Sequence, residues 1–131
     1  MRNLISTHGH AFLDYLLAFT LLIAPWFFDF AEDSTGKTLC LLAGGLIVVM
    51  NFFSKHELGI VRLIPMSFHL NMDVLFGMFL ILCVFLFEMS YPTYVLMALG
   101  GFITLGGALY TKPYMKKHQP PIEIKDDTER D

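Results

Sequence analysis

Four apolar segments, each close to the length of a membrane-spanning helix, constrain this chain more than any other feature. They cover about residues 10–28, 38–53, 68–87 and 94–110. A helix needs roughly 20 residues to cross the hydrocarbon core, and in lipid its backbone polar groups must bond within the segment. No segment carries a polar face wide enough to meet water, which argues against a soluble bundle of buried helices. The sequence therefore predicts an all-α protein built as a four-helix transmembrane bundle.

Composition supports a membrane protein and disfavours a nucleic-acid partner. The chain is 55% hydrophobic and 16% charged, whereas a soluble domain carries roughly 25% charged residues. Its net charge of −3 gives no basic excess for binding nucleic acid, so the partner we expect is the lipid bilayer. Cys40 and Cys83 lie inside apolar segments and outside any C-x-x-C pair. We expect both thiols to be free.

The positions of lysine and arginine predict the orientation in the membrane. Basic residues fall before the first segment, between the second and third, and after the fourth: Arg2, Lys55, Arg62, Lys112, Lys116 and Lys117. The other two connections hold one basic residue among acidic ones. By the positive-inside rule, both termini and the middle loop are cytoplasmic, and we expect a bacterial inner (plasma) membrane. Residues 1–112 form the transmembrane domain, and the polar, proline-containing tail 113–131 is predicted to be disordered.

The two halves of the chain are an internal repeat. His10 and Asp14 match His69 and Asp73 at an offset of 59, and 43–45 matches 99–101 at an offset of 56. We attribute the three-residue difference to a shorter outer loop in the second half. The repeats, about 8–54 and 67–112, each cross twice. They are therefore predicted to be parallel two-helix repeats related by a pseudo-two-fold axis along the membrane normal.

Three stretches carry a resemblance to a known family. They are His8-Gly9-His10-Ala11-Phe12-Leu13-Asp14-Tyr15, Ala24-Pro25-Trp26-Phe27-Phe28 and the stretch 57–66. With these, the chain resembles the SPW-repeat integral membrane proteins. Ala24 stands where the family has Ser, and the second copy of the motif is replaced by 83–85. The resemblance implies a four-helix membrane fold and supplies no function.

The two His-Asp pairs are the candidates for chemistry. The i, i+4 spacing puts each pair on one helix face, about 6 Å apart along the axis. A carboxylate beside an imidazole suits a proton relay, a metal site or haem ligation. It equally suits a purely structural role, polar glue, in which hydrogen bonds hold the helices together. The repeat predicts that both pairs face each other in one polar cluster. The cofactor and the metal stay open.

Arg62 and Glu57 lie on the same predicted side of the membrane as both pairs. Arg62 either forms a bidentate bond with one of the two aspartates or faces lipid phosphates. We include both residues in the candidate polar cluster. His8, His56 and His118 are expected on the solvent side.

Two further groups of residues have structural interpretations. Pro25 and Trp26 are typical of a helix end with an interfacial anchor. Gly100, Thr104 and Ala108 form a small-residue stripe that favours close helix contact, and the paired glycines at 44–45 and 106–107 are interpreted in the same way.

These observations lead to two hypotheses about function. The first is a non-enzymatic membrane scaffold or interaction protein, whose cytoplasmic polar cluster holds two helix pairs together. The alternative is a proton-, metal- or haem-linked membrane factor that uses His10 and His69. Four helices leave little room for an aqueous pathway, so transport would require a homo-oligomer or another membrane protein.

Overall fold

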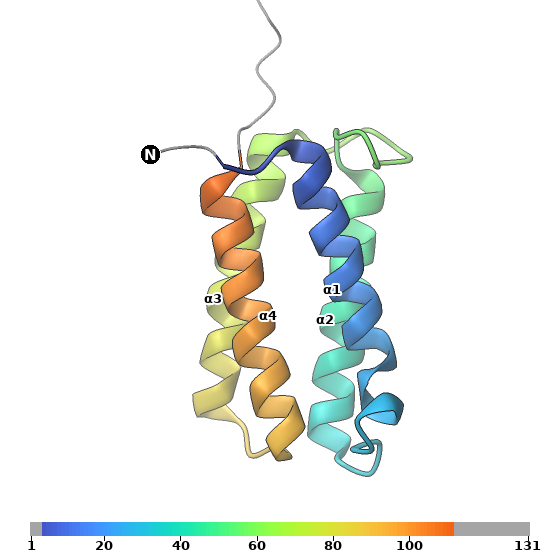
Figure 1. The fold of residues 1–131 in the computed structure, drawn as a ribbon, viewed down its shortest axis with the longest axis vertical. Helices are drawn as coiled ribbons and strands as arrows, with labels where there is room; N and C mark the ends of the chain where they lie inside the picture. The colour runs from blue at the N-terminus through green and yellow to red at the C-terminus, as the bar shows by residue number, and fades with distance from the viewer. Residues whose placement is uncertain (1–3, 112–131) are drawn as a thin grey trace, which may run out of the picture.

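The computed structural model describes residues 4–111 and contains four helices in that range (Figure 1). They are α1 (Thr7–Phe27), α2 (Ser34–Phe53), α3 (Met66–Leu86) and α4 (Tyr91–Tyr110). All four are long and apolar enough to span a membrane, which confirms the predicted all-α, four-helix fold. The predicted tail, 113–131, and His118 lie outside the described residues.

All four helices begin earlier than the apolar pattern predicts, and polar side chains cap the first two. The Ser6 side chain accepts from the backbone N–H of Gly9 at the start of α1, and Asp33 accepts from Gly36 at the start of α2. Each cap satisfies a backbone donor that a helix N-terminus leaves free. The second and fourth segments, which are short in the hydropathy pattern, form helices of 20 residues each; α2 begins at the Asp33 cap, and α4 has a proline in its first turn.

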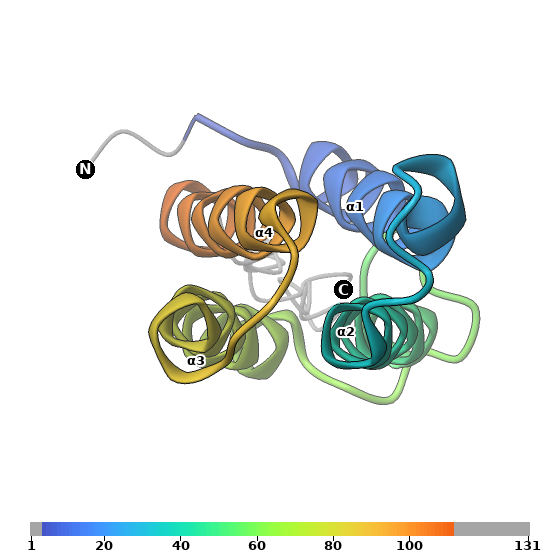
Figure 2. The ribbon, with the colours of Figure 1, turned by 90° about the horizontal axis from the view of Figure 1, so that it is seen from below.

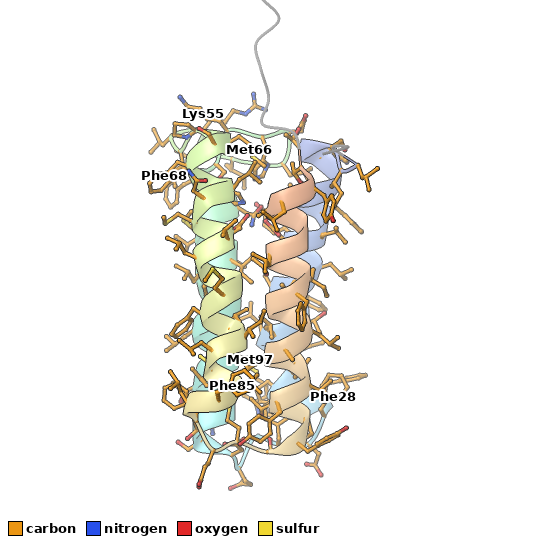
Figure 3. All side chains as sticks on the ribbon, turned by 90° about the vertical axis from the view of Figure 1, so that its left-hand side faces the viewer. Phe28, Lys55, Met66, Phe68, Phe85 and Met97 are labelled. Carbon is orange, nitrogen blue, oxygen red and sulfur yellow. The ribbon has the colours of Figure 1, made fainter. Side chains whose placement is uncertain are left out.

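The four helices form two antiparallel hairpins that lie side by side (Figure 2). Helix α1 packs along α2, α3 packs along α4, and α1 also contacts α4. Large apolar side chains such as Phe68 and Phe85 project outward, as expected for a surface in lipid, while Met97 lies inside the bundle (Figure 3). Cys40 and Cys83 are buried and free, as predicted.

The contacts of the glycines correct the register of the repeat. A Cβ on Gly44 would lie 2.9 Å from the Ala18 carbonyl oxygen, and a Cβ on Gly101 would lie 2.8 Å from the Gly77 carbonyl oxygen. Because Ala18 and Gly77 are equivalent at an offset of 59, Gly44 is equivalent to Gly101, at an offset of 57. The offset of 56 was wrong. The loop 87–90 is accordingly two residues shorter than the loop 28–33.

The middle loop is irregular and folds back on the end of α2. The backbone N–H groups of Ile60 and Val61 both donate to the Phe52 carbonyl, and that of Lys55 donates to Ile64. The bonds to Phe52 satisfy a helix-end carbonyl that would otherwise be unpaired. They also place residues 54–56 over the end of the bundle, where the candidate site lies.

At the opposite end of the bundle, Asp33 joins the two hairpins. Its carboxylate caps α2 and also accepts from the backbone N–H of Ser90 at 2.7 Å and from the Thr93 hydroxyl at 3.3 Å. Burial raises the pKa of Asp33, but the hydrogen bonds from Gly36, Ser90 and Thr93 outweigh it and hold the pKa below its usual value.

Candidate functional site

The two His-Asp pairs meet at one point between α1 and α3. His10 Nε2 lies 2.9 Å from Asp73 Oδ2 and 3.2 Å from Asp14 Oδ2. His69 Nε2 lies 3.0 Å from Asp73 Oδ2 and 3.2 Å from Asp14 Oδ2. Each imidazole nitrogen therefore faces both carboxylates, one from its own repeat and one from the other.

These four side chains, which we call the His-Asp cluster, are inside the bundle rather than in contact with lipid. His10 and His69 have no exposed surface, and Asp14 and Asp73 are 4% and 7% exposed. The two imidazole rings stand edge to face, with their centroids 5.5 Å apart. Both histidines belong to the first turn of their helices, so the cluster lies near the end of the bundle that carries the middle loop.

A hydroxyl group behind each histidine fixes where its proton resides. Ser54 Oγ donates to the Met50 carbonyl at 2.6 Å and lies 2.7 Å from His69 Nδ1. Because a serine has a single O–H to donate, Ser54 must accept from His69, and Nδ1 of His69 carries a hydrogen.

The second repeat builds the same arrangement with a threonine. Thr111 Oγ1 donates to the Gly107 carbonyl at 2.6 Å and lies 3.1 Å from His10 Nδ1. Nδ1 of His10 therefore carries a hydrogen too. Ser54 and Thr111 are equivalent at the corrected offset of 57.

This bonding pattern leaves the cluster in need of positive charge. A neutral imidazole protonated at Nδ1 presents a lone pair at Nε2, and here both Nε2 atoms face carboxylate oxygens about 3 Å away. Facing acceptors repel, and two buried carboxylates need compensating charge. The two Nε2 atoms and the two carboxylate oxygens that face them can be satisfied by two additional protons, one on each Nε2, or by one divalent cation.

Asn51 breaks the symmetry of the cluster. Its Nδ2 donates to Asp14 Oδ2 at 3.1 Å and to the Ile47 carbonyl at 3.0 Å. Its Oδ1 is buried and has no hydrogen-bond partner within residues 4–111. The equivalent residue in the second repeat is Ala108, so Asp73 receives no corresponding amide.

The structure does not bring Arg62 or Glu57 into the cluster, contrary to prediction. Both residues are exposed in the middle loop, and the Glu57 carboxylate accepts from the Thr7 hydroxyl at 2.8 Å. The carboxylates of Asp14 and Asp73 face the two histidines instead, and the buried position of the cluster keeps it away from the loop surface.

His56 was wrongly expected on the solvent side. It is 5% exposed, its ring centroid lies 5.9 Å from that of His69, and its Nδ1 accepts from the backbone N–H of Leu58. Burial lowers the pKa of His56. The middle loop has no periodic pattern of apolar residues that would predict this burial.

The other predicted structural residues take up distinct positions. Pro25 is buried in the last turn of α1, while Trp26 is exposed on its surface. The stripe residues Gly100, Thr104 and Ala108 are all buried, and α3 and α4 approach closely at Gly77 and Gly101, where a Cβ on Gly77 would lie 2.8 Å from the Gly101 carbonyl oxygen. Of the glycine pairs, Gly44 and Gly107 face neighbouring side chains, whereas Gly45 and Gly106 face open space.

Comparison with known proteins gives one match. A family model described as the SPW repeat domain matches residues 8–111, a span that contains all four helices and the whole His-Asp cluster. No curated protein and no solved structure matches the chain.

Proposed function

Since the chain belongs to the SPW repeat domain family and is an integral membrane protein with four spanning helices, we propose that it is a non-enzymatic membrane scaffold whose His-Asp cluster binds one divalent transition-metal ion. The observation that carries this proposal is the convergence of two imidazole nitrogens and two carboxylate oxygens, with both Nδ1 hydrogens held by hydroxyl groups. The metal would hold the two helix pairs together.

The distances within the cluster suit a four-ligand metal shell. For metal–ligand bonds of about 2.1 Å, neighbouring donor atoms lie about 3.0 Å apart in a square arrangement and about 3.4 Å apart in a tetrahedron. The four N–O distances are 2.9–3.2 Å, and all four donor atoms lie within 4.8 Å of one another. Mixed imidazole and carboxylate ligands suit zinc, iron or manganese.

The hydroxyl groups have the role that outer-shell partners have in metal sites. A metal-ligating histidine usually donates its second N–H to an oxygen, which fixes its tautomer and its orientation. Ser54 and Thr111 accept such bonds from His69 and His10. This supports a cluster that takes up a metal or extra protons over one that merely joins the helices through neutral imidazoles, in which Nε2 would donate to a carboxylate and Nδ1 would accept.

Haem is the least compatible of the predicted alternatives. A haem-ligating Nε2 must point at an iron in the plane of a porphyrin, but both Nε2 atoms here are covered by Asp14 and Asp73 at about 3 Å. A pair of additional protons has the same total charge as a divalent metal. The proton-loaded cluster is therefore the alternative that an experiment must separate from the metal.

Metal analysis of the detergent-purified protein tests the proposal. We expect about one divalent metal per chain, its loss in His69→Ala, and its retention in His8→Ala, which removes an exposed histidine near the same end. A chelator should also lower the stability of the wild type. A metal-free preparation that takes up no metal on titration, and whose unfolding is unchanged by chelator, would show that protons alone fill the cluster.

We also propose that the protein lies in the bacterial inner membrane with both termini in the cytoplasm. The distribution of basic residues supports this orientation. It places the His-Asp cluster at the cytoplasmic side, where a metal ion would arrive from the cytoplasm.

A further inference from the structure

A groove between α2 and α3 reaches from the lipid-facing surface to the His-Asp cluster. It has a volume of about 300 Å³. Its lining is almost entirely apolar: Leu46, Ile47 and Met50 come from α2, and Phe76 and Phe79 come from α3 together with Asp73. Among the residues that line it, Asp73 is the one charged side chain.

On the corresponding side of the bundle, between α4 and α1, a smaller residue allows the two helices to pack closely. Gly107 is the equivalent of Met50 at an offset of 57, and a Cβ on Gly107 would lie only 3.2 Å from His10 Nδ1. Helix α4 therefore approaches α1 closely, whereas the side chain of Met50 stands in the corresponding position between α2 and α3. The two repeats share the cluster, and the groove lies on its α2–α3 side.

The charged end and the apolar end of the groove lie at different depths in the membrane. Asp73 belongs to the second turn of α3, and Phe79 is six residues further along the helix, which corresponds to about 9 Å towards the bilayer centre. The carboxylate thus lies at the end nearer the lipid headgroups, and the aromatic walls extend inward. An amphiphile placed in this groove would have the same orientation as the surrounding lipids.

From this placement we propose that the groove binds a lipophilic organic cation, such as an alkylammonium, with its ammonium group against Asp73 and its chain along Phe76 and Phe79. A negative group in an apolar wall selects a positive partner, because burying it unpaired is costly. Aromatic faces beside an ammonium add a cation–π attraction. This site goes beyond the proposed metal centre and does not need the metal: Asp73 contacts His10 and His69 through Oδ2, and we place the ammonium group against its other oxygen, Oδ1.

Equilibrium binding to chelator-treated protein in zwitterionic lipid nanodiscs tests this inference. The probe is radiolabelled decyltrimethylammonium, with decylsulfonate as a partner of equal chain length and opposite charge, and empty nanodiscs measure partition into lipid. We expect saturable binding of one ammonium probe per chain and no saturable binding of the sulfonate. Saturable binding of the sulfonate with similar affinity would overturn the proposal, since the groove would then select only for an apolar chain.

Two matched pairs of variants locate the site. Asp73→Asn should weaken ammonium binding by about 10-fold or more, while Glu57→Gln, which removes a carboxylate charge from the exposed middle loop at the same end of the bundle, should change it little. Leu46→Trp should block the groove, whereas Ile103→Trp, at the equivalent lipid-facing position of α4, should not. Equal losses in Asp73→Asn and Glu57→Gln, or binding that survives Asp73→Asn and Leu46→Trp, would refute a groove site. Absence of metal with these results intact would refute only the proposed metal centre.

Discussion

The serine behind His69 offers the sharpest test of the proton arrangement in the cluster. Replacing Ser54 by alanine removes the acceptor that lies 2.7 Å from His69 Nδ1. Ser54 and His69 both have no exposed surface, so water is poorly placed to substitute for the hydroxyl. The ring would then keep a buried N–H without a partner, or move its hydrogen to Nε2 and lose its lone pair toward the cluster.

The expected magnitudes follow from this burial. Interhelical hydrogen bonds in membranes contribute about 0.6 kcal/mol on average, and an unsatisfied buried donor costs about 1–3 kcal/mol. Because the bond is short and links the end of α2 to α3, we expect Ser54→Ala to lower the free energy of unfolding by about 1–2 kcal/mol. Loss of an outer-shell partner should also weaken metal binding by about 10- to 100-fold.

Three measurements check these values. Competition with a chelator gives the metal affinity, unfolding in mixed detergent gives the stability, and ¹⁵N NMR of the imidazoles shows which nitrogen is protonated. The matched control is Thr20→Ala, because the Thr20 hydroxyl bonds only to the Leu16 carbonyl on an exposed face of α1. A wild-type spectrum with the hydrogen of His69 on Nε2, or a Ser54→Ala protein that matches Thr20→Ala in affinity and stability, would refute the reasoning.

Three further predictions concern packing, pH and topology. Gly77→Ala should destabilise the bundle by about 1–3 kcal/mol, because its Cβ would meet α4 backbone atoms at 2.8 and 2.9 Å. The control Gly106→Ala, at a position that faces open space, should be neutral or stabilising. Equal thermal unfolding of the two variants would contradict this prediction. The lowered pKa of Asp33 means that its contribution to stability is present above its unfolded pKa of about 4 and is lost as the pH falls through the folded value. Acid unfolding should therefore be less steep in Asp33→Asn, and an unchanged profile would argue against this bond network. Cysteines placed at residues 30–36 and 88–92, at the outer end of the bundle, should react with an impermeant reagent on intact cells, and labelling of the middle loop instead would reverse the proposed topology.

The fold was predictable because its main determinant is local. The length and apolarity of each segment specify a spanning helix without knowledge of its neighbours. The repeat then adds long-range information, since a pseudo-two-fold axis along the membrane normal puts equivalent residues at equal depth. That is why His10, Asp14, His69 and Asp73 could be expected in one layer before any contact was known.

Features that depend on particular side-chain contacts were not predictable. The pairs Gly44-Gly45 and Gly100-Gly101 align naturally at an offset of 56, and only the close contact of Gly44 with Ala18 shows that the correct offset is 57. Arg62 was expected either to bond an aspartate of the cluster or to face lipid phosphates, and no pattern in the sequence decides between the two. Nor does any pattern indicate that Ser54 and Thr111 lie behind the histidines. The burial of His56 depends on how the middle loop folds over α2, and no periodic pattern records it.

The hydroxyl groups of Ser54 and Thr111 distinguish neutral histidines that merely join the helices from a cluster that binds positive charge, and they do so more clearly than the charged residues do. Glue between helices needs only that each histidine donate to a carboxylate, which a neutral ring does from Nε2 while Nδ1 accepts. In both repeats the hydroxyl is already committed to a backbone carbonyl, so Nδ1 must donate and Nε2 is left to face the carboxylates. The two repeats reach this arrangement with different residues, Ser54 and Thr111, which share nothing beyond the hydroxyl itself. In a bundle surrounded by lipid, where water cannot correct the mismatch, a cluster built in this way depends on the positive charge that it binds.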